Sequence, residues 1–159
     1  LPQGGMPALG DNPLFLGCAD YRSTIASNGE SSGFTFPEEM RRHADKGTAL
    51  VTDKDPGDAE IAEVVSQAAA HSCIVLGTYN GHILQGQLRL AKALAATGLP
   101  MILVALRNPY DLRNMPDHVA ALAGWEYTRP LFDALWPVLN GTARPTGKLP
   151  LLTLTKAAK

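Results

Sequence analysis

Neither sign of charge is in excess in this sequence. Its 159 residues include 14 lysines and arginines and 15 aspartates and glutamates, a formal net charge of -1. Nucleic-acid-binding proteins use clustered basic residues to displace counterions from phosphates, and this balance leaves no such footprint. Long hydrophobic runs are missing too, since stretches such as residues 100–106 are far shorter than the roughly 20 residues that cross a bilayer. We therefore expect no nucleic-acid partner and no membrane span.

Cysteine is scarce, and the histidines are scattered. Cys18 and Cys73 lie far apart in apolar segments, which excludes a disulfide framework or a zinc motif and favours inert core thiols. The four histidines have no H-x-x-x-H or C-x-x-C neighbours. The spacing of these residue types therefore predicts no metal site.

Several motifs that carry chemistry are absent. No G-x-S-x-G turn presents a nucleophile, and residues 141–148 only superficially resemble a phosphate-binding G-x-x-x-x-G-K-[ST] loop. The nearest match to a dinucleotide fingerprint, residues 77–81, has the wrong glycine spacing and a bulky Tyr79 at its centre. No two carboxylates are singled out by their setting as an acid and base pair. We expect no catalytic residue and no cofactor in this chain.

What the sequence contains is typical of one folded domain. Hydrophobic residues make up 45% of the chain, and its 15 glycines and 12 prolines stay below a low-complexity composition. The length is that of a single domain. We expect one α/β domain over residues 1–159, with a core over 13–141 and a C-terminal tail over 142–159. Because the chain starts at Leu1 without a signal peptide, we expect it to be a piece of a longer protein.

Apolar runs and helical stripes alternate along the chain. Continuous apolar segments between turn-forming residues are typical of strands buried on both faces of a parallel sheet. This pattern predicts strands over residues 13–18, 48–52, 73–77 and 101–106. Residues 118–124 form either a fifth strand or a short helix, because their alanines suit both.

Between these runs, apolar residues recur at the three- and four-residue spacing of one helix face. The pattern predicts helices over residues 37–46, 58–71, 83–97 and 130–140, and Pro137 should break or kink the last of them. The alternation predicts an α/β fold, a three-layer sandwich with helices on both faces of a mainly parallel sheet. We expect about five or six strands in a flavodoxin-like arrangement.

Polar clusters follow three of the predicted strands, at the carboxyl ends where open α/β sheets bind ligands. The same residue types also suit ordinary turns, in which Asn and Asp bond to local backbone. The candidates for ligand-binding or structural loop residues are Asp20, Arg22, Asn80, His82, Arg107, Asn108, Tyr110 and Asp111.

Two stretches resemble a known family. Residues 104–112 read VALRNPYDL and follow a helix that opens with G-x-x-x-x-G-Q-x-x-L at residues 81–90. Residues 130–150 read PLFDALWPVLNGTARPTGKLP. Both resemble the C-terminal α/β domain of family 3 glycoside hydrolases, in particular two-domain bacterial β-N-acetylglucosaminidases. The similarity is clear over about residues 77–150 and weaker over residues 13–78.

The resemblance implies a partner, an N-terminal (β/α)8 catalytic barrel, with a carbohydrate substrate at the interface between the two domains. In such enzymes the barrel carries the aspartate nucleophile and, in this branch, an Asp–His acid/base pair. No segment here resembles that barrel. In other branches the second domain supplies the acid/base carboxylate, but no glutamate here stands in a matching motif. We therefore expect an accessory domain of a hydrolase of β-linked N-acetylglucosaminides or related sugars, inactive by itself.

The resemblance also places residues 107–111 in one loop. We expect this loop to be a structural lock in which Arg107 pairs with a carboxylate, and Asn108 or Asp111 accepts backbone N–H bonds around Pro109. A second interpretation is that the loop lines the mouth of the barrel. Measuring stability and sugar handling on one Asp111 variant would separate the two.

Two other functions stay open. One is a stand-alone α/β domain that binds a sugar or a nucleotide through the loops of Asp20, Asn80 and Asn108. The other is an interaction module that docks a partner through an exposed apolar surface. A barrel of roughly 300–350 residues encoded directly upstream would favour the accessory domain over both.

Overall fold

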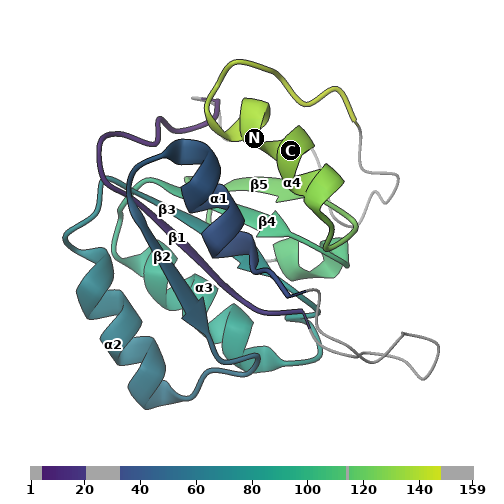
Figure 1. Ribbon diagram of the computed structural model, residues 1–159. Coiled ribbons are helices and arrows are strands. Elements are labelled where there is room, and N and C mark those ends of the chain that lie inside the picture. The colour runs from purple at the N-terminus through teal and green to yellow at the C-terminus, as the bar shows by residue number, and fades with distance from the viewer. Residues whose placement is uncertain (1–4, 21–32, 114, 148–159) are drawn as a thin grey trace, which may run out of the picture.

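The computed structural model describes residues 5–20, 33–113 and 115–147. In this part of the chain, five strands form one parallel sheet in the order β2-β1-β3-β4-β5 (Figure 1). The strands are β1 (Pro13–Cys18), β2 (Thr48–Thr52), β3 (Cys73–Thr78), β4 (Met101–Ala105) and β5 (Ala120–Ala123). The helices are α1 (Phe36–Ala44), α2 (Asp58–Ala68), α3 (Gln85–Ala96) and α4 (Arg129–Leu139), and a 3-10 helix, η1, covers Pro109–Leu112.

This architecture confirms the α/β sandwich with a parallel sheet that the sequence predicts. The first two apolar runs are strands over the expected residues, and the predicted helices end within a few residues of the observed ones. The strand interpretation of residues 118–124 is right, because Ala120–Ala123 pairs in parallel with β4. Of the break or kink expected at Pro137, the break does not occur. Helix α4 continues to Leu139, and the Asn140 N–H donates to the Trp136 carbonyl at 2.9 Å.

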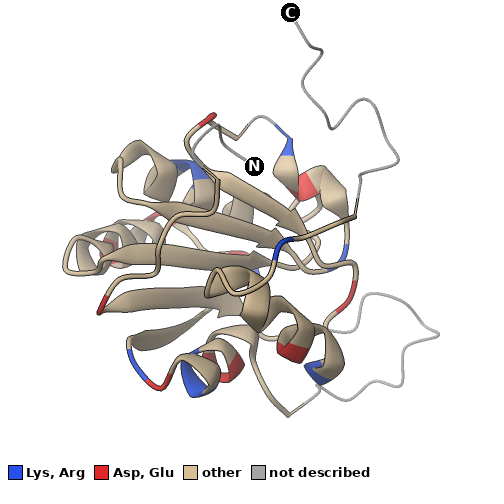
Figure 2. Ribbon diagram, turned by 90° about the horizontal axis from the view of Figure 1, so that it is seen from above, with Lys and Arg blue, Asp and Glu red and all other residues tan. Residues whose placement is uncertain are grey.

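Helices cover both faces of the sheet. α1 and α4 lie together on one face, and α2 and α3 lie together on the other (Figure 1). Side chains alternate along each strand, so in β1 Phe15 joins the core under α1 and α4 while Leu14 and Leu16 join the core under α2 and α3. The strands carry no Lys, Arg, Asp or Glu, and charged residues are spread over the surrounding helices and loops (Figure 2).

The two most apolar strands lie side by side at the centre. β3 and β4 are parallel, fully buried and joined by α3, as the sequence predicts. The strand order reverses at β1, because the chain moves to β2 on one side and then crosses to β3 on the other. In open α/β sheets, this switch point is where the carboxyl ends of the strands receive ligands.

One glycine shapes this switch point. A Cβ atom on Gly77, near the end of β3, would lie 2.5 Å from a ring atom of Phe36. Phe36 is the first residue of α1, and its fully buried ring therefore packs directly on the backbone of β3. Within the described residues, no helix is long and apolar enough to cross a membrane.

Candidate functional site

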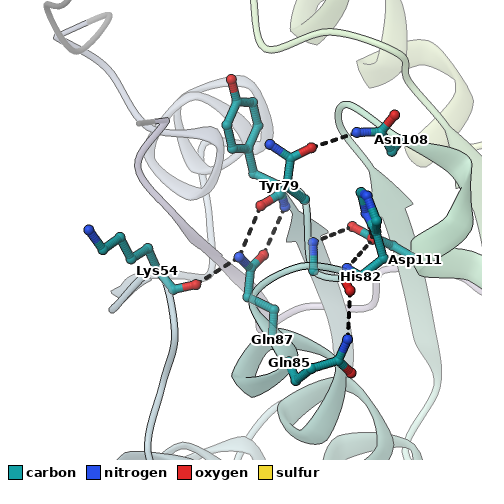
Figure 3. A network of polar contacts seen from close by, with 9 residues as sticks. Lys54, Tyr79, His82, Gln85, Gln87, Asn108 and Asp111 are labelled. Carbon is teal, nitrogen blue, oxygen red and sulfur yellow. Dashed lines mark hydrogen bonds and ion pairs between the residues drawn. The ribbon is translucent and has the colours of Figure 1, made fainter. Parts of the chain in front are cut away.

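The carboxyl edge of the sheet is built from the loop between β3 and α3 and the loop after β4. Asn80 has a left-handed backbone, with φ of +57°, a conformation that Asn adopts more readily than most residues. Its carbonyl accepts the N–H groups of Ile83 at 2.9 Å and Leu84 at 3.1 Å, which makes the tight turn before α3. The Oδ1 atom of Asn80 accepts a hydrogen bond of 2.6 Å from Asn108 Nδ2, so the two loops are linked (Figure 3).

Asp111 joins the same two loops through a carboxylate. It lies in η1, and its side chain is fully buried. Oδ2 accepts the Gly81 N–H at 2.9 Å, and Oδ1 accepts the His82 N–H at 2.7 Å. The Nδ1 atom of His82 lies 3.1 Å from the same Oδ1 (Figure 3). Asp111 therefore accepts backbone N–H bonds, as expected, but from the loop before α3 and not from the backbone around Pro109.

Gln87 of α3 is a second buried side chain that links loops, and it is not among the candidates from the sequence. Its Nε2 donates to the carbonyls of Lys54 at 2.8 Å and Tyr79 at 3.0 Å, and its Oε1 accepts the Tyr79 N–H at 2.8 Å (Figure 3). Asp55 Oδ1 accepts the Gly86 N–H at 2.7 Å and so caps the first turn of α3. The sequence signal that could have identified Gln87 is a polar amide at a position where the helix pattern otherwise has apolar residues.

Arg107 does not pair with a carboxylate among the described residues, contrary to the expectation. Its Nη1 donates to the Tyr79 hydroxyl at 2.6 Å, and its guanidinium carbon lies 5.5 Å from the centroid of that ring. The physical reason is topological. β4 lies beside β3, so the side chain within reach of Arg107 is the one that follows β3.

Tyr127 is a connector that sequence reasoning missed. Its hydroxyl donates to the Cys18 carbonyl at 3.1 Å and accepts the Phe36 N–H at 2.7 Å, which ties the end of β1 to the start of α1. Burial raises the pKa of this phenol above its ordinary value of 10.0. The sequence did contain a signal for a buried Tyr127. This residue directly precedes Thr128, the N-cap residue of α4, and an apolar residue at that position often packs against the first turns of the helix.

The remaining candidates lie at different places along this edge. Asp20 follows β1 and is half-buried, whereas Arg22 lies outside the described residues. Tyr110 lies in η1, with its ring centroid 5.6 Å from that of His82. The structure thus brings His82, Tyr110 and Asp111 together and pairs Asn80 with Asn108. Asp20 belongs to the loop after β1, on the other side of β3 from this cluster.

These contacts mainly hold the loops in place. In the part of the chain that the structure describes, no hydroxyl or thiol is hydrogen-bonded to a histidine as an activated nucleophile would be. Burial raises the pKa of Cys18 to about 12 and of Cys73 to about 11, so both thiols are protonated at neutral pH. Among the same residues, no group of three His, Cys, Asp or Glu side chains is placed to hold a metal ion.

Comparison with known proteins gives matches among solved structures alone. No protein-family model and no curated protein matches the chain. The structure is similar to that of a glycoside hydrolase family 3 β-N-acetylglucosaminidase from Paenibacillus sp. str. FPU-7, with a TM-score of 0.80 and 25% sequence identity. The match covers 98% of this chain and 30% of that chain.

Two further structures share the fold at lower identity. A fungal multi-domain family 3 β-N-acetylglucosaminidase has a TM-score of 0.67 and 19% identity, over 94% of this chain and 16% of that one. A β-glucosidase from Listeria innocua has a TM-score of 0.65 and 15% identity, over 90% of this chain and 22% of that one. This chain therefore spans less than a third of each of these proteins. The likeness agrees with the resemblance seen in the motifs at residues 104–112 and 130–150.

Proposed function

We propose that this chain, which resembles a domain of family 3 glycoside hydrolases in fold and motifs, is the accessory domain of such an enzyme. Its partner is a (β/α)8 barrel that carries the catalytic residues. The substrates are β-linked N-acetylglucosaminides or related sugars, since the Paenibacillus structure and the fungal structure are both β-N-acetylglucosaminidases. The chain packs beside the barrel and cleaves no bond by itself.

The observation that carries this proposal is the extent of the structural match. The Paenibacillus enzyme covers 98% of this chain, whereas this chain covers 30% of that enzyme. One whole unit of a family 3 hydrolase therefore corresponds to this chain, and most of that hydrolase has no counterpart here. A unit of this size in a larger enzyme has a neighbouring domain to contact.

The polar chemistry of the carboxyl edge supports a positioning role over a catalytic one. Cleavage of a glycosidic bond needs two carboxyl groups that flank the bond, about 5–9.5 Å apart. Asp111, the buried carboxylate of this edge, uses both oxygens to hold the backbone of Gly81 and His82. A carboxylate committed in this way orders a loop and is poorly placed to attack a sugar.

Exposed apolar side chains at the same edge support a partner domain. Among the described residues, the large hydrophobic side chains that remain exposed are Val51, Ile83, Tyr110 and Trp125. Val51 is the next-to-last residue of β2, and the other three follow β3, β4 and β5 in turn. Aromatic residues such as Tyr and Trp are enriched where proteins bury a surface against a partner.

Trp125 is held in this exposed position. Its backbone has φ of +71°, which is strained for a bulky residue, and 50% of its surface is exposed. Before it, the Gly124 N–H donates to the Ala105 carbonyl at 2.8 Å, and after it Tyr127 is anchored in the core. Because the chain is held on both sides of Trp125, this side chain stays on the surface, at the edge of the sheet where we propose that the barrel docks.

A hydrolysis assay tests the proposal. The isolated chain and the complete protein, with the barrel that precedes it, are each incubated with p-nitrophenyl β-N-acetylglucosaminide. We expect nitrophenol release from the complete protein and none above the no-enzyme blank from the isolated chain. Turnover by the isolated chain that a substitution in this chain abolishes would contradict the accessory role. A parent gene that encodes no barrel would contradict it as well.

A further inference from the structure

A pocket of about 440 Å³ opens beside the Asp111 cluster. We infer that it binds a small anionic molecule with a hydroxylated body, whose carboxylate or phosphate group is held between Lys92 and Arg113. The volume falls in the range of small-molecule sites in proteins, roughly 300–1,000 Å³. This site goes beyond the proposed accessory role, because the isolated chain contains all of it. The side chains that line it are those of His82, Gln85, Leu88, Lys92, Tyr110 and Arg113.

The charge of the lining selects an anion. Lys92 and Arg113 are both cationic, and no lining residue is acidic. Neither makes an ion pair with any residue in the described part of the chain. By contrast Arg89, also on α3, lies 3.7 Å from Asp58. Charge-assisted hydrogen bonds to carboxylate or phosphate oxygens are stronger than neutral ones, so the pair favours an oxyanion.

One wall of the pocket is ordered before any ligand arrives. The guanidinium carbon of Arg113 lies 4.9 Å from the centroid of the Tyr110 ring, and the centroid of the His82 ring lies 5.6 Å from the same centroid. Tyr110 itself belongs to η1, which Asp111 ties to the loop before α3. A wall that is already in place reduces the ordering cost of binding.

The hydrogen-bonding roles of the two ring nitrogens of His82 indicate why the body of the ligand should carry hydroxyl groups. The carboxylate of Asp111 can only accept a hydrogen bond, so Nδ1 of His82, 3.1 Å away, carries the hydrogen. The other ring nitrogen, Nε2, remains for a ligand, and a hydroxyl group suits it because a hydroxyl can both donate and accept a hydrogen bond. Gln85 lines the same pocket, and its Nε2 already donates to the His82 carbonyl at 2.6 Å.

Titration of the isolated chain with three matched sugars tests the inference. The probes are D-glucose, glucuronate and glucose 6-phosphate, followed through the backbone amide NMR signals of α3 and η1. We expect both anions to bind at least about tenfold more tightly than glucose, a difference of about 1.4 kcal/mol. The tighter of the two identifies the group as carboxylate or phosphate, and added salt should weaken both.

Matched variants locate the site. Lys92→Gln and Arg113→Gln should each weaken anion binding by about tenfold, whereas Arg89→Gln, on the same helix but outside the pocket, should leave it unchanged. All three positions are exposed, so circular dichroism should show folded variants. Equal binding of glucose and the two anions would overturn the inference, and so would an equal loss in Arg89→Gln. Neither outcome depends on hydrolase activity, so the inference and the proposed function fail separately.

Discussion

At the scale of single residues, Asp111 decides how two loops meet. Asp111→Ala removes the acceptor of the Gly81 N–H, which is buried, and of the His82 N–H, which is partly buried. We expect the free energy of unfolding to fall by about 1–3 kcal/mol, because buried donors without a partner lose their hydration as well as their bond. Urea denaturation followed by circular dichroism measures this change.

The control for Asp111 is an exposed carboxylate. Asp58→Ala removes a side chain that is almost fully exposed and should change the free energy of unfolding by no more than about 0.5 kcal/mol. The other interpretation, in which the loop of residues 107–111 lines the mouth of the barrel, predicts a different result for Asp111→Ala. In that case Asp111→Ala would leave the melting temperature unchanged but alter KM in the barrel-containing protein. If it alters neither quantity, both interpretations of the loop fail.

The two thiols give a second prediction at this scale. Burial raises the pKa of Cys18 to about 12 and of Cys73 to about 11, so neither forms thiolate at pH 8. We expect no reaction of the native chain with a disulfide reagent such as DTNB at that pH, and reaction of both cysteines in guanidinium chloride. Rapid labelling of one thiol in the native chain would show that its strand end opens easily.

At the scale of elements, Glu39 links two helices across one face of the sheet. It lies on α1 and contacts Arg42 of the same helix at 2.6 Å and Arg129 of α4 at 3.3 Å. Burial by itself raises the pKa of Glu39, but the hydrogen bonds and charges of Arg42 and Arg129 outweigh it and hold the pKa below its ordinary 4.5. A carboxyl group of lowered pKa stabilises the fold above its unfolded pKa and loses this effect as pH falls.

The pH dependence of Glu39→Gln tests this link. At pH 7 the substitution should lower the free energy of unfolding by about 1–2 kcal/mol, through the loss of charge-assisted hydrogen bonds. The difference from the unmodified chain should begin to shrink as pH falls below the ordinary value of 4.5, because the unfolded chain then takes up a proton at Glu39. It should disappear below the lowered pKa of the folded chain, where the folded Glu39 is uncharged as well. Glu63→Gln, at an exposed position of α2, is the control and should show neither effect. A difference that stays constant with pH would contradict an ionic link.

At the scale of the whole molecule, a substitution of Trp125 should affect the stability of the isolated chain and the proposed docking to the barrel differently. Glycine adopts a φ of +71° without strain, so Trp125→Gly should leave the isolated chain as stable as before or slightly more stable. If the barrel docks on Trp125 as proposed, the barrel-containing protein should lose stability, because the substitution removes a buried aromatic contact between the domains. Calorimetry of both proteins, with and without the substitution, measures the two effects. An equal loss in both proteins would assign Trp125 to the fold alone.

The fold was largely readable from local patterns. The runs at residues 13–18 and 48–52 are strands over the same residues because short apolar segments between turn formers have few other stable conformations. Residues 118–124 were ambiguous, since alanine suits helix and strand. Pairing with β4 settled their conformation. Pro137 does not break α4, because the bond from the Asn140 N–H to the Trp136 carbonyl resumes the helix after the proline.

The sequence by itself determined the class of fold, the buried strand pair and the polar character of the loops at their carboxyl ends. These properties depend on composition and spacing within short segments. Only the tertiary structure decided which polar groups meet: Asp111 with Gly81 and His82, Arg107 with a tyrosine instead of an acid, and Tyr127 with Cys18. These partners are far apart in the chain. Their meeting depends on which strands are neighbours, and the packing of the whole core sets that order.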